Sequence, residues 1–474
     1  MENNSICVPK ASPIPLPELE AYLAPYAPLF RREPTRRSLE RYITGLLTDL
    51  RHKTCDTIAD AVAGTSVERL QHLLTDADWQ AEALDEQRVR RLVQASPRGG
   101  VLILDDTGLP KQGKRSVGVA RQYSGTLGKV GNCQVVVSAE YAADDLASST
   151  PLHWPVTARL YLPERWANDP ERRRKAGVPE EQAFQTKPEI ALELVDQARN
   201  WQVPFEFVVS DAGYGDNPGF LEGLEERQVR YVCGVGSDFG VRLPHQVQAS
   251  ESASLPEYQG KGRPRLPRPA ALYKAEKISQ GLRQEAWQTI TWREGSKGPL
   301  CKQFAAVRVH RAAGNAGQGQ SVNHSRIMTG PEGWLLAERP VPGEQGDCKW
   351  YYSNLPADTP LERLVALAHA RWMKEQFYQQ AKGECGLRDY QGRRWDGFHR
   401  HLALAMLAHS FLVQHRMAAS EPAEGAFFPL CRRADVAGSP PAGAHLVARG
   451  PCAVAHSHQP DQSPVPSPEL TKQY

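Results

Sequence analysis

Two adjacent carboxylates at the end of an apolar run are the residues of this chain that most suggest chemistry. Residues 101–104 read Val-Leu-Ile-Leu, and Asp105 and Asp106 follow them directly, before Thr107 and Gly108. An apolar run of this kind, ended by turn-forming residues, predicts a strand buried on both faces. Because an unpaired buried carboxylate is costly, the pair indicates either a bound cation or a turn in which the acids face water.

Two further acids occur where the fold could bring them beside this pair. Asp211 follows an expected strand over residues 205–210, and Glu375 lies on a long helix expected over residues 360–382. Arg371 stands four residues before Glu375 and Lys382 stands seven after it, so at about 100° per residue all three side chains project from one helix face. This pattern fits either surface salt bridges or a site in which the acid holds a metal and the cations hold phosphates.

Three segments of the chain, in order, resemble the acid motifs of insertion-sequence DDE transposases. The segment that begins at Arg371 resembles the family signature Tyr-x2-Arg-x3-Glu-x6-Lys, with Arg371, Glu375 and Lys382 at the matching positions and Ala368 in place of the tyrosine. Leu-Asp-Asp-Thr-Gly at residues 104–108 resembles the first-acid strand, and residues 208–215 resemble the second. The resemblance implies an RNase H-like fold and two divalent ions, usually Mg²⁺, held by three carboxylates.

Carried over to this chain, the resemblance implies that Asp105 or Asp106, Asp211 and Glu375 are the catalytic metal ligands. We favour Asp105, because it leaves an Asp-x-Thr pattern common at this strand and because Asp106 would then point to the opposite side. Carboxylate ligands without His or Cys favour Mg²⁺ or Mn²⁺ over zinc. The resemblance also places Arg371 and Lys382 on flanking DNA phosphates.

The glycine-rich stretch over residues 111–134 follows the first acid and carries several cations, among them Lys111 and Arg121. These two residues are expected to contact DNA, although an ordinary polar hairpin would have a similar composition. Trp287, Trp292 and Trp334 fit either a stacking platform for an extruded base or the core of a small β module.

The elements that must position these residues follow from hydrophobic periodicity. The pattern predicts the order β-β-β-α-β-α-β, with strands over residues 101–105, 133–141, 156–162, 205–210 and 229–235 and helices over 188–201 and 217–227. The expected fold class is therefore α/β, and the resemblance implies that this order forms an RNase H-like core with a mixed five-stranded sheet and flanking helices. A β-rich insertion interrupts this core, and a helical domain precedes it.

The expected domain boundaries follow the changes in pattern along the chain. They are an N-terminal helical DNA-binding region over 1–95, the first part of the catalytic core over 96–239, the β-rich insertion over 240–345, the second part of the core over 346–417, and a disordered tail over 418–474.

Composition narrows the cellular setting. The 474 residues carry a net charge of +3, with 41% hydrophobic and 23% charged residues, which is ordinary for a globular protein. The nine cysteines form no Cys-x-x-Cys pair, which argues against a zinc site or a disulfide framework. No apolar export segment opens the chain, and its longest apolar run is too short to span a membrane. We therefore expect a cytoplasmic protein, and the resemblance to insertion-sequence transposases implies a bacterial one that associates with the nucleoid.

Together these features predict a transposase that cleaves DNA at element ends and transfers the 3′-hydroxyl ends into target DNA. Its partners would be double-stranded DNA, both the terminal inverted repeats and the target, and a second copy of the chain, since the family implies a homodimer on DNA. Two alternatives remain open: an RNase H-like nuclease without strand transfer, and an inactive DNA-binding regulator derived from a transposase.

Overall fold

The structure, a computed structural model, describes residues 10–146, 151–252, 270–295, 298–313 and 328–420. The disorder predicted for residues 418–474 falls almost entirely outside this range. Only its first three residues are described, and they continue the last helix, α15 (Trp395–Ser420), rather than starting a tail.

A single 12-stranded sheet runs through the described chain in the order β2-β3-β1-β5-β6-β12-β11-β10-β7-β8, with β4 paired to β3 and β9 paired to β10. The strands that form its catalytic half are β1 (Gly100–Pro110), β2 (Ala120–Ser124), β3 (Lys129–Ala142), β4 (His153–Leu160), β5 (Phe205–Ser210) and β6 (Arg230–Val235).

The arrangement β4-β3-β1-β5-β6 has the order expected of the RNase H-like core. The pairs β1–β3 and β3–β4 are antiparallel, whereas β1–β5 and β5–β6 are parallel. The parallel connections pass through α8 (Lys187–Asn200) and α10 (Pro218–Glu226). Both helices begin as the sequence indicates: Thr186 and Glu189 form a capping box on α8, and Asn217 caps α10.

The β-rich segment over 240–345 does not form a sheet of its own. Its described strands hydrogen-bond into the core sheet. It contributes β7 (Gly240–Arg242), β8 (Tyr273–Lys274), β9 (Gln288–Gly295), β10 (Gly298–Ala313) and β11 (Met328–Arg339), together with α11 (Pro244–Glu251), α12 (Ala275–Gln280) and η2 (Gln284–Ala286). β12 (Lys349–Ser353) joins the two parts, since it pairs antiparallel with β6 on one side and with β11 on the other. The backbone N–H and C=O groups along the β6 edge of the core sheet are therefore hydrogen-bonded to β12 and are not left exposed.

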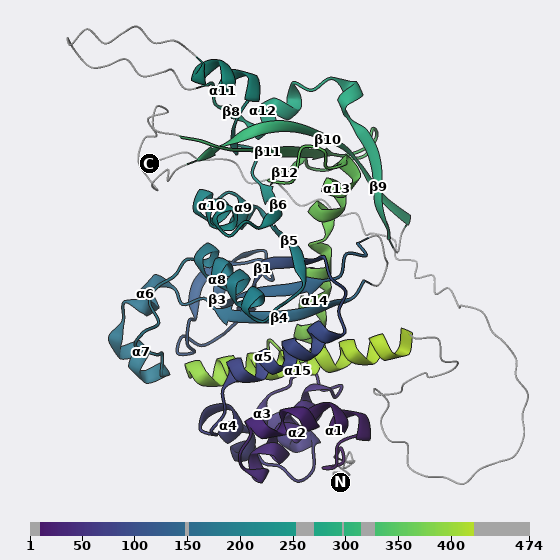
Figure 1. Ribbon diagram of the computed structural model, residues 1–474. Helices are drawn as coiled ribbons and strands as arrows, with labels where there is room; N and C mark the ends of the chain where they lie inside the picture. Colours follow the sequence, from purple (N-terminus) through teal and green to yellow (C-terminus); the bar gives the residue numbers. More distant parts are fainter. Residues whose placement is uncertain (1–9, 147–150, 253–269, 296–297, 314–327, 421–474) are drawn as a thin grey trace, which may run out of the picture. The chain divides into compact units, whose positions relative to one another are not determined.

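Helices cover the other side of the core. The N-terminal region contains α1 (Pro17–Leu23), η1 (Ala24–Leu29), α2 (Glu33–Leu46), α3 (Cys55–Ala61), α4 (Val67–Thr75) and α5 (Ala81–Gln94), and the short helices α6 (Glu164–Ala167) and α7 (Pro170–Ala176) follow β4. In Figure 1, α5 and α15 lie between the N-terminal helices and the sheet. Residues 401–411 of α15 are all buried, which explains why that helix is apolar around its whole circumference.

The helix predicted over 360–382 is two helices, α13 (Leu361–His369) and α14 (Trp372–Gly383), and the single continuous helix was wrong. At the junction, the N–H groups of Ala370 and Lys374 bond carbonyls three residues back rather than four, so the turn tightens. Arg371 lies at this junction, and it is the residue that reaches the acids of the sheet.

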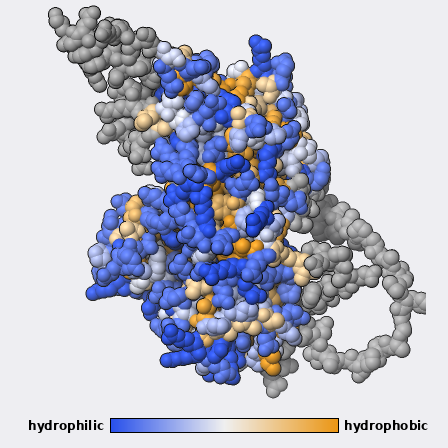
Figure 2. Space-filling model, in the orientation of Figure 1, coloured by the Kyte–Doolittle hydropathy of each residue, from blue (hydrophilic) through white to orange (hydrophobic). Residues whose placement is uncertain are grey.

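The described surface is largely polar. Figure 2 shows a face on which hydrophilic side chains predominate and apolar ones form small patches. Within the described ranges, none of the helices combines the length and apolar character needed to cross a membrane.

Candidate active site

The two predicted aspartates lie next to each other on neighbouring parallel strands, Asp105 within β1 and Asp211 directly after β5. Ile103 of β1 is in register with Val209 of β5, so two residues further along each strand stand Asp105 and Asp211. Asp211 is also the N-cap of the short helix α9 (Ala212–Gly215), and its carboxylate accepts a hydrogen bond from the Gly213 N–H at 3.0 Å. Strand pairing therefore brings together acids that are more than a hundred residues apart in the chain.

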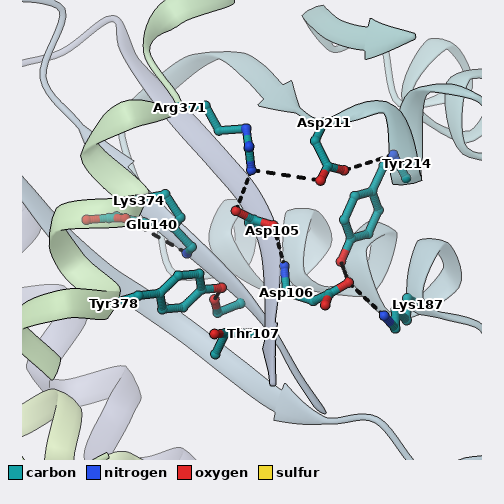
Figure 3. Close-up of polar contacts among 12 residues, drawn as sticks. Asp105, Asp106, Thr107, Glu140, Lys187, Asp211, Tyr214, Arg371, Lys374 and Tyr378 are labelled. Atoms are coloured by element: carbon teal, nitrogen blue, oxygen red, sulfur yellow. Dashed lines mark hydrogen bonds and ion pairs between the residues drawn. The ribbon is translucent and has the colours of Figure 1, made fainter. Parts of the chain in front are cut away.

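One guanidinium bridges the two carboxylates. Arg371 Nη1 lies 2.6 Å from Asp105 Oδ2 and 3.8 Å from Asp211 Oδ2, and Figure 3 shows the guanidinium between them. Burial opposes the charge of Arg371, but the nearby carboxylates more than offset it, so its pKa lies above the ordinary value. The two aspartates thus face one shared cation.

Asp105 occupies a site that disfavours its charge. Its side chain is 12% exposed. Burial raises its pKa from 3.8 to about 6, with Arg371 opposing the rise and Asp211 adding to it. An acid kept near its titration range by burial and by a like charge is typical of sites that hold cations or move protons.

Asp106 points to the other face of β1, as strand alternation predicts. Its Oδ2 accepts a hydrogen bond from Lys187 Nζ at 2.9 Å and lies 3.5 Å from the Tyr214 hydroxyl. Figure 3 shows this group on the far side of the strand from Arg371. Of the two adjacent acids, Asp105 is therefore the one that shares a cation with Asp211.

Glu375 does not join the two aspartates by a direct contact. Its side chain is exposed on α14, although its charge helps to raise the pKa of Arg371. Across the described ranges, no three His, Cys, Asp or Glu side chains lie close enough together to hold a metal ion. The structure thus brings Asp105 and Asp211 together, whereas Glu375 lies on the adjoining helix without contact to either.

The predicted cations take different positions. Lys382 Nζ donates to Thr107 Oγ1 at 2.6 Å and to Thr126 Oγ1 at 2.7 Å, and burial lowers its pKa to about 8. Lys111 donates to the backbone carbonyl of Tyr390, and burial lowers its pKa to about 8 as well. Its ammonium group is therefore directed into the protein, whereas Arg121 is exposed on β2.

A buried ionic group beside Asp105 escaped the sequence reasoning. Lys374 is fully buried, 3.9 Å from Glu140 Oε2, and Glu140 Oε1 lies 2.6 Å from His153 Nδ1. Burial lowers the pKa of Lys374 to about 8, while Glu140 and Asp105 both act to raise it. A lone glutamate inside the apolar run of β3 was the one signal that could have indicated this group, because such an acid needs a partner.

A partly buried tyrosine on the same helix also faces this group. Tyr378 Oη lies 2.7 Å from Ser138 Oγ of β3, and Figure 3 shows its ring beside Lys374 and Asp105. Through Arg371, Lys374, Tyr378 and Lys382, successive turns of α14 contact the strands that carry the acids, which fixes the helix against the site.

The donor set fits a hard divalent cation in part. Asp105 and Asp211 supply carboxylate oxygens that already converge on one positive charge, and oxygen donors of this kind prefer Mg²⁺ or Mn²⁺. Glu375 supplies the same chemistry from the first turn of α14 but has no contact with either aspartate. DDE endonucleases as a group depend on divalent metal, and the two aspartates are the residues here that fit that requirement.

Comparison with known proteins agrees with this geometry. Residues 25–299, more than half of the chain, match the family described as DDE superfamily endonuclease. The matched segment includes Asp105 and Asp211 and ends before α14. The chain is also 31% identical over 234 residues to a protein of Microchaete diplosiphon described as the probable transposase for insertion sequence element IS701. That match covers 48% of this chain and 56% of the relative's length.

The predicted resemblance to insertion-sequence DDE transposases is therefore confirmed. With two aspartates side by side on adjacent parallel strands of a mixed sheet, and with a match over more than half its length, the chain belongs to the DDE superfamily endonucleases.

Proposed function

We propose that this protein is the transposase of an insertion sequence, which cleaves DNA at the element ends and transfers the 3′-hydroxyl ends into target DNA. The observation that carries the proposal is the convergence of Asp105, within β1, and Asp211, directly after β5, on one cation, Arg371. The likeness to the IS701 protein supports the choice of transposition over other endonuclease reactions.

Asp105, Asp211 and Glu375 would hold the divalent metal, Mg²⁺ or Mn²⁺. Bound there, the metal supplies an activated oxygen nucleophile and charge stabilisation for phosphodiester attack. Arg371 neutralises both aspartates in the structure, and its fork of N–H donors suits a phosphate beside them. Lys382 is held next to β1 by Thr107 and Thr126 and provides a second positive charge along the same helix face.

The substrate would be double-stranded DNA, as both terminal inverted repeats and target, bound by a homodimer. The N-terminal helices over 1–95 would contribute to end recognition, with the catalytic core over 96–239 and 346–417 and the β-rich insertion over 240–345. The place of action would be the bacterial cytoplasm, on chromosomal DNA of the nucleoid.

The deciding experiment supplies the purified full chain with labelled duplexes from the DNA that flanks its gene, a target plasmid and Mg²⁺ or Mn²⁺. Joined product supports the transposase. Nicks without joining would support the nuclease, and binding without cleavage would support the regulator.

Variants at the acids test the assigned residues. Asp211→Asn and Glu375→Gln should abolish cleavage and leave end binding largely intact, because they remove a charge without changing size. Asp106→Asn is the matched control, since Asp106 pairs with Lys187 on the opposite face of β1, and it should retain cleavage. Loss of end binding in the Asp211 or Glu375 variants would mean that these residues are structural.

A further inference from the structure

We propose that the hairpin formed by β2 and the start of β3, residues 120–130, is a DNA-contacting element in which Tyr123 stacks on an unpaired base beside the acids. We call these residues the basic hairpin. The inference rests on the proposed function, because it names the surface that would receive the DNA strand next to the catalytic aspartates.

Charge is the first observation that supports DNA as the occupant. Residues 107–139 contain no Asp or Glu, whereas the chain as a whole is nearly balanced, at +3. The cations of this stretch are Lys111, Lys114, Arg115, Arg121 and Lys129, and all except Lys111 are exposed. A surface that carries only positive charge within such a long stretch is complementary to a polyanion.

The apolar side chains at the hairpin are the second observation. Three of the seven large hydrophobic side chains that are exposed in the described part of the chain lie here: Tyr123 at 63%, Val130 at 53% and Leu127 at 38%. Tyr123 and Val130 are directly paired in the β2–β3 register, so their side chains share one face. Aromatic and apolar side chains set among cations are the combination by which proteins hold unpaired bases.

The third observation is that the hairpin tip is fixed next to the site. Thr126 Oγ1 donates to the Gly108 carbonyl at 2.9 Å and accepts from Lys382 Nζ at 2.7 Å. The same ammonium group donates to Thr107 at 2.6 Å. The tip is therefore tied to β1 only a few residues beyond Asp105.

Gly108 makes this close approach possible. A Cβ at that position would lie 2.1 Å from Ser124 Oγ, a distance that no side chain tolerates. Ser124 itself is buried against β1 while its neighbour Tyr123 faces outward, as strand alternation requires. The exposed tyrosine is thus held in place by a buried serine and a glycine on the catalytic strand.

The three tryptophans that the sequence offered as stacking candidates already pack against other side chains of the protein. The Trp292 ring stacks on His369 with centroids 3.9 Å apart, and Arg339 lies 4.0 Å from the Trp287 ring centroid. Arg308 lies 5.0 Å from the centroid of Trp334. The Tyr123 ring, by contrast, is 63% exposed to solvent.

The test measures binding of the full chain to two labelled duplexes from the DNA that flanks its gene, one fully paired and one with a single unpaired base beside the cleavage position. Wild type should bind the second duplex more tightly. Tyr123→Ala should lose about tenfold in affinity for that duplex and little for the paired one. Tyr123→Phe should keep the preference, because it keeps the ring.

Two further variants complete the design. Phe184→Ala removes another partly exposed aromatic ring, at 37% exposure, which contacts Tyr161 and is not part of the hairpin, and it should behave as wild type. A double variant, Arg121→Gln with Lys129→Gln, should lower the slope of log affinity against log salt by about 2.

The outcomes separate the two proposals. If wild type binds and cleaves DNA and Tyr123→Ala matches it on both duplexes, the stacking inference is overturned while the proposed function stands. If wild type neither binds nor cleaves either duplex, the proposed function fails and the inference fails with it. A preference for the unpaired base that depends on the Tyr123 ring supports the inference.

Discussion

Replacing Asp105 with Asn is expected to stabilise the metal-free protein at neutral pH and to remove its response to divalent metal. The carboxyl group is almost fully buried, and burial raises its pKa from 3.8 to about 6 even though Arg371 opposes the rise. Ionisation of this group therefore lowers the free energy of unfolding, whereas the amide of Asn carries no charge and has no such effect.

The sign of the effect follows from proton linkage. Below pH 3.8 the carboxyl group is protonated in both the folded and unfolded states, so it contributes no difference in stability. As pH rises from 3.8 to about 6, the folded state keeps a proton that the unfolded state has lost, and stability falls. Above about pH 6 the whole cost is present, and this rise in pKa corresponds to about 3 kcal/mol.

The Asp105→Asn variant regains only part of this loss in unfolding free energy. Its side-chain oxygen can still accept the hydrogen bond that the Asp106 N–H donates to Asp105 at 2.7 Å. Its amide group cannot also accept well from Arg371, which costs about 1 kcal/mol or more. We therefore expect Asp105→Asn to gain about 1 to 2 kcal/mol above pH 6 and nothing below pH 4.

Thermal unfolding of both proteins between pH 4 and 8, in EDTA and then across a Mg²⁺ titration, measures the effect. At a Mg²⁺ concentration of about 100 times Kd, wild type should gain about 2.7 kcal/mol, and Asp105→Asn should gain little. Asp106→Asn serves as the control, because it loses the Lys187 pair and should keep the metal response. A variant that is no more stable than wild type in EDTA at pH 8, or that still responds fully to Mg²⁺, would refute the reasoning.

Three other changes have defined outcomes. Lys382→Ala should weaken DNA binding and lower its salt slope by about 1; an unchanged slope in a binding titration would place its ammonium away from phosphate. Gly108→Ala should lower the unfolding free energy by about 1 to 3 kcal/mol, since its Cβ would meet Ser124 Oγ, and denaturant unfolding with Ser124→Ala added should recover part of the loss. Arg88→Ala should cost about 3 to 5 kcal/mol by the same method, because it leaves the buried Asp85 without its 2.8 Å ion pair; a loss below 1 kcal/mol would contradict this.

The local elements of the core could be predicted from the sequence because their causes are local. The apolar run of residues 101–104 indicates a buried strand wherever it packs, and the strand over 205–210 has the bounds that its residues predict. The caps at Ser66 and Asn217 use side chains that bond backbone N–H groups within three residues. The main strands and helices of the core were therefore readable in advance, although β1 continues to Pro110, so that Asp105 lies within the strand and not at its end.

The tertiary structure alone decided how the site is connected. Arg371 pairs with Asp105, 266 residues away in the chain, because α13 ends just before it and the tightened turn carries its side chain to β1. Helical spacing placed Arg371 and Glu375 on one face, but it could not show that the former would bridge the aspartates while the latter remains exposed. The burial of Lys374 beside Glu140 was hidden for the same reason. Periodicity reports which face of an element is apolar, whereas the partner of a charged side chain depends on which elements pack together.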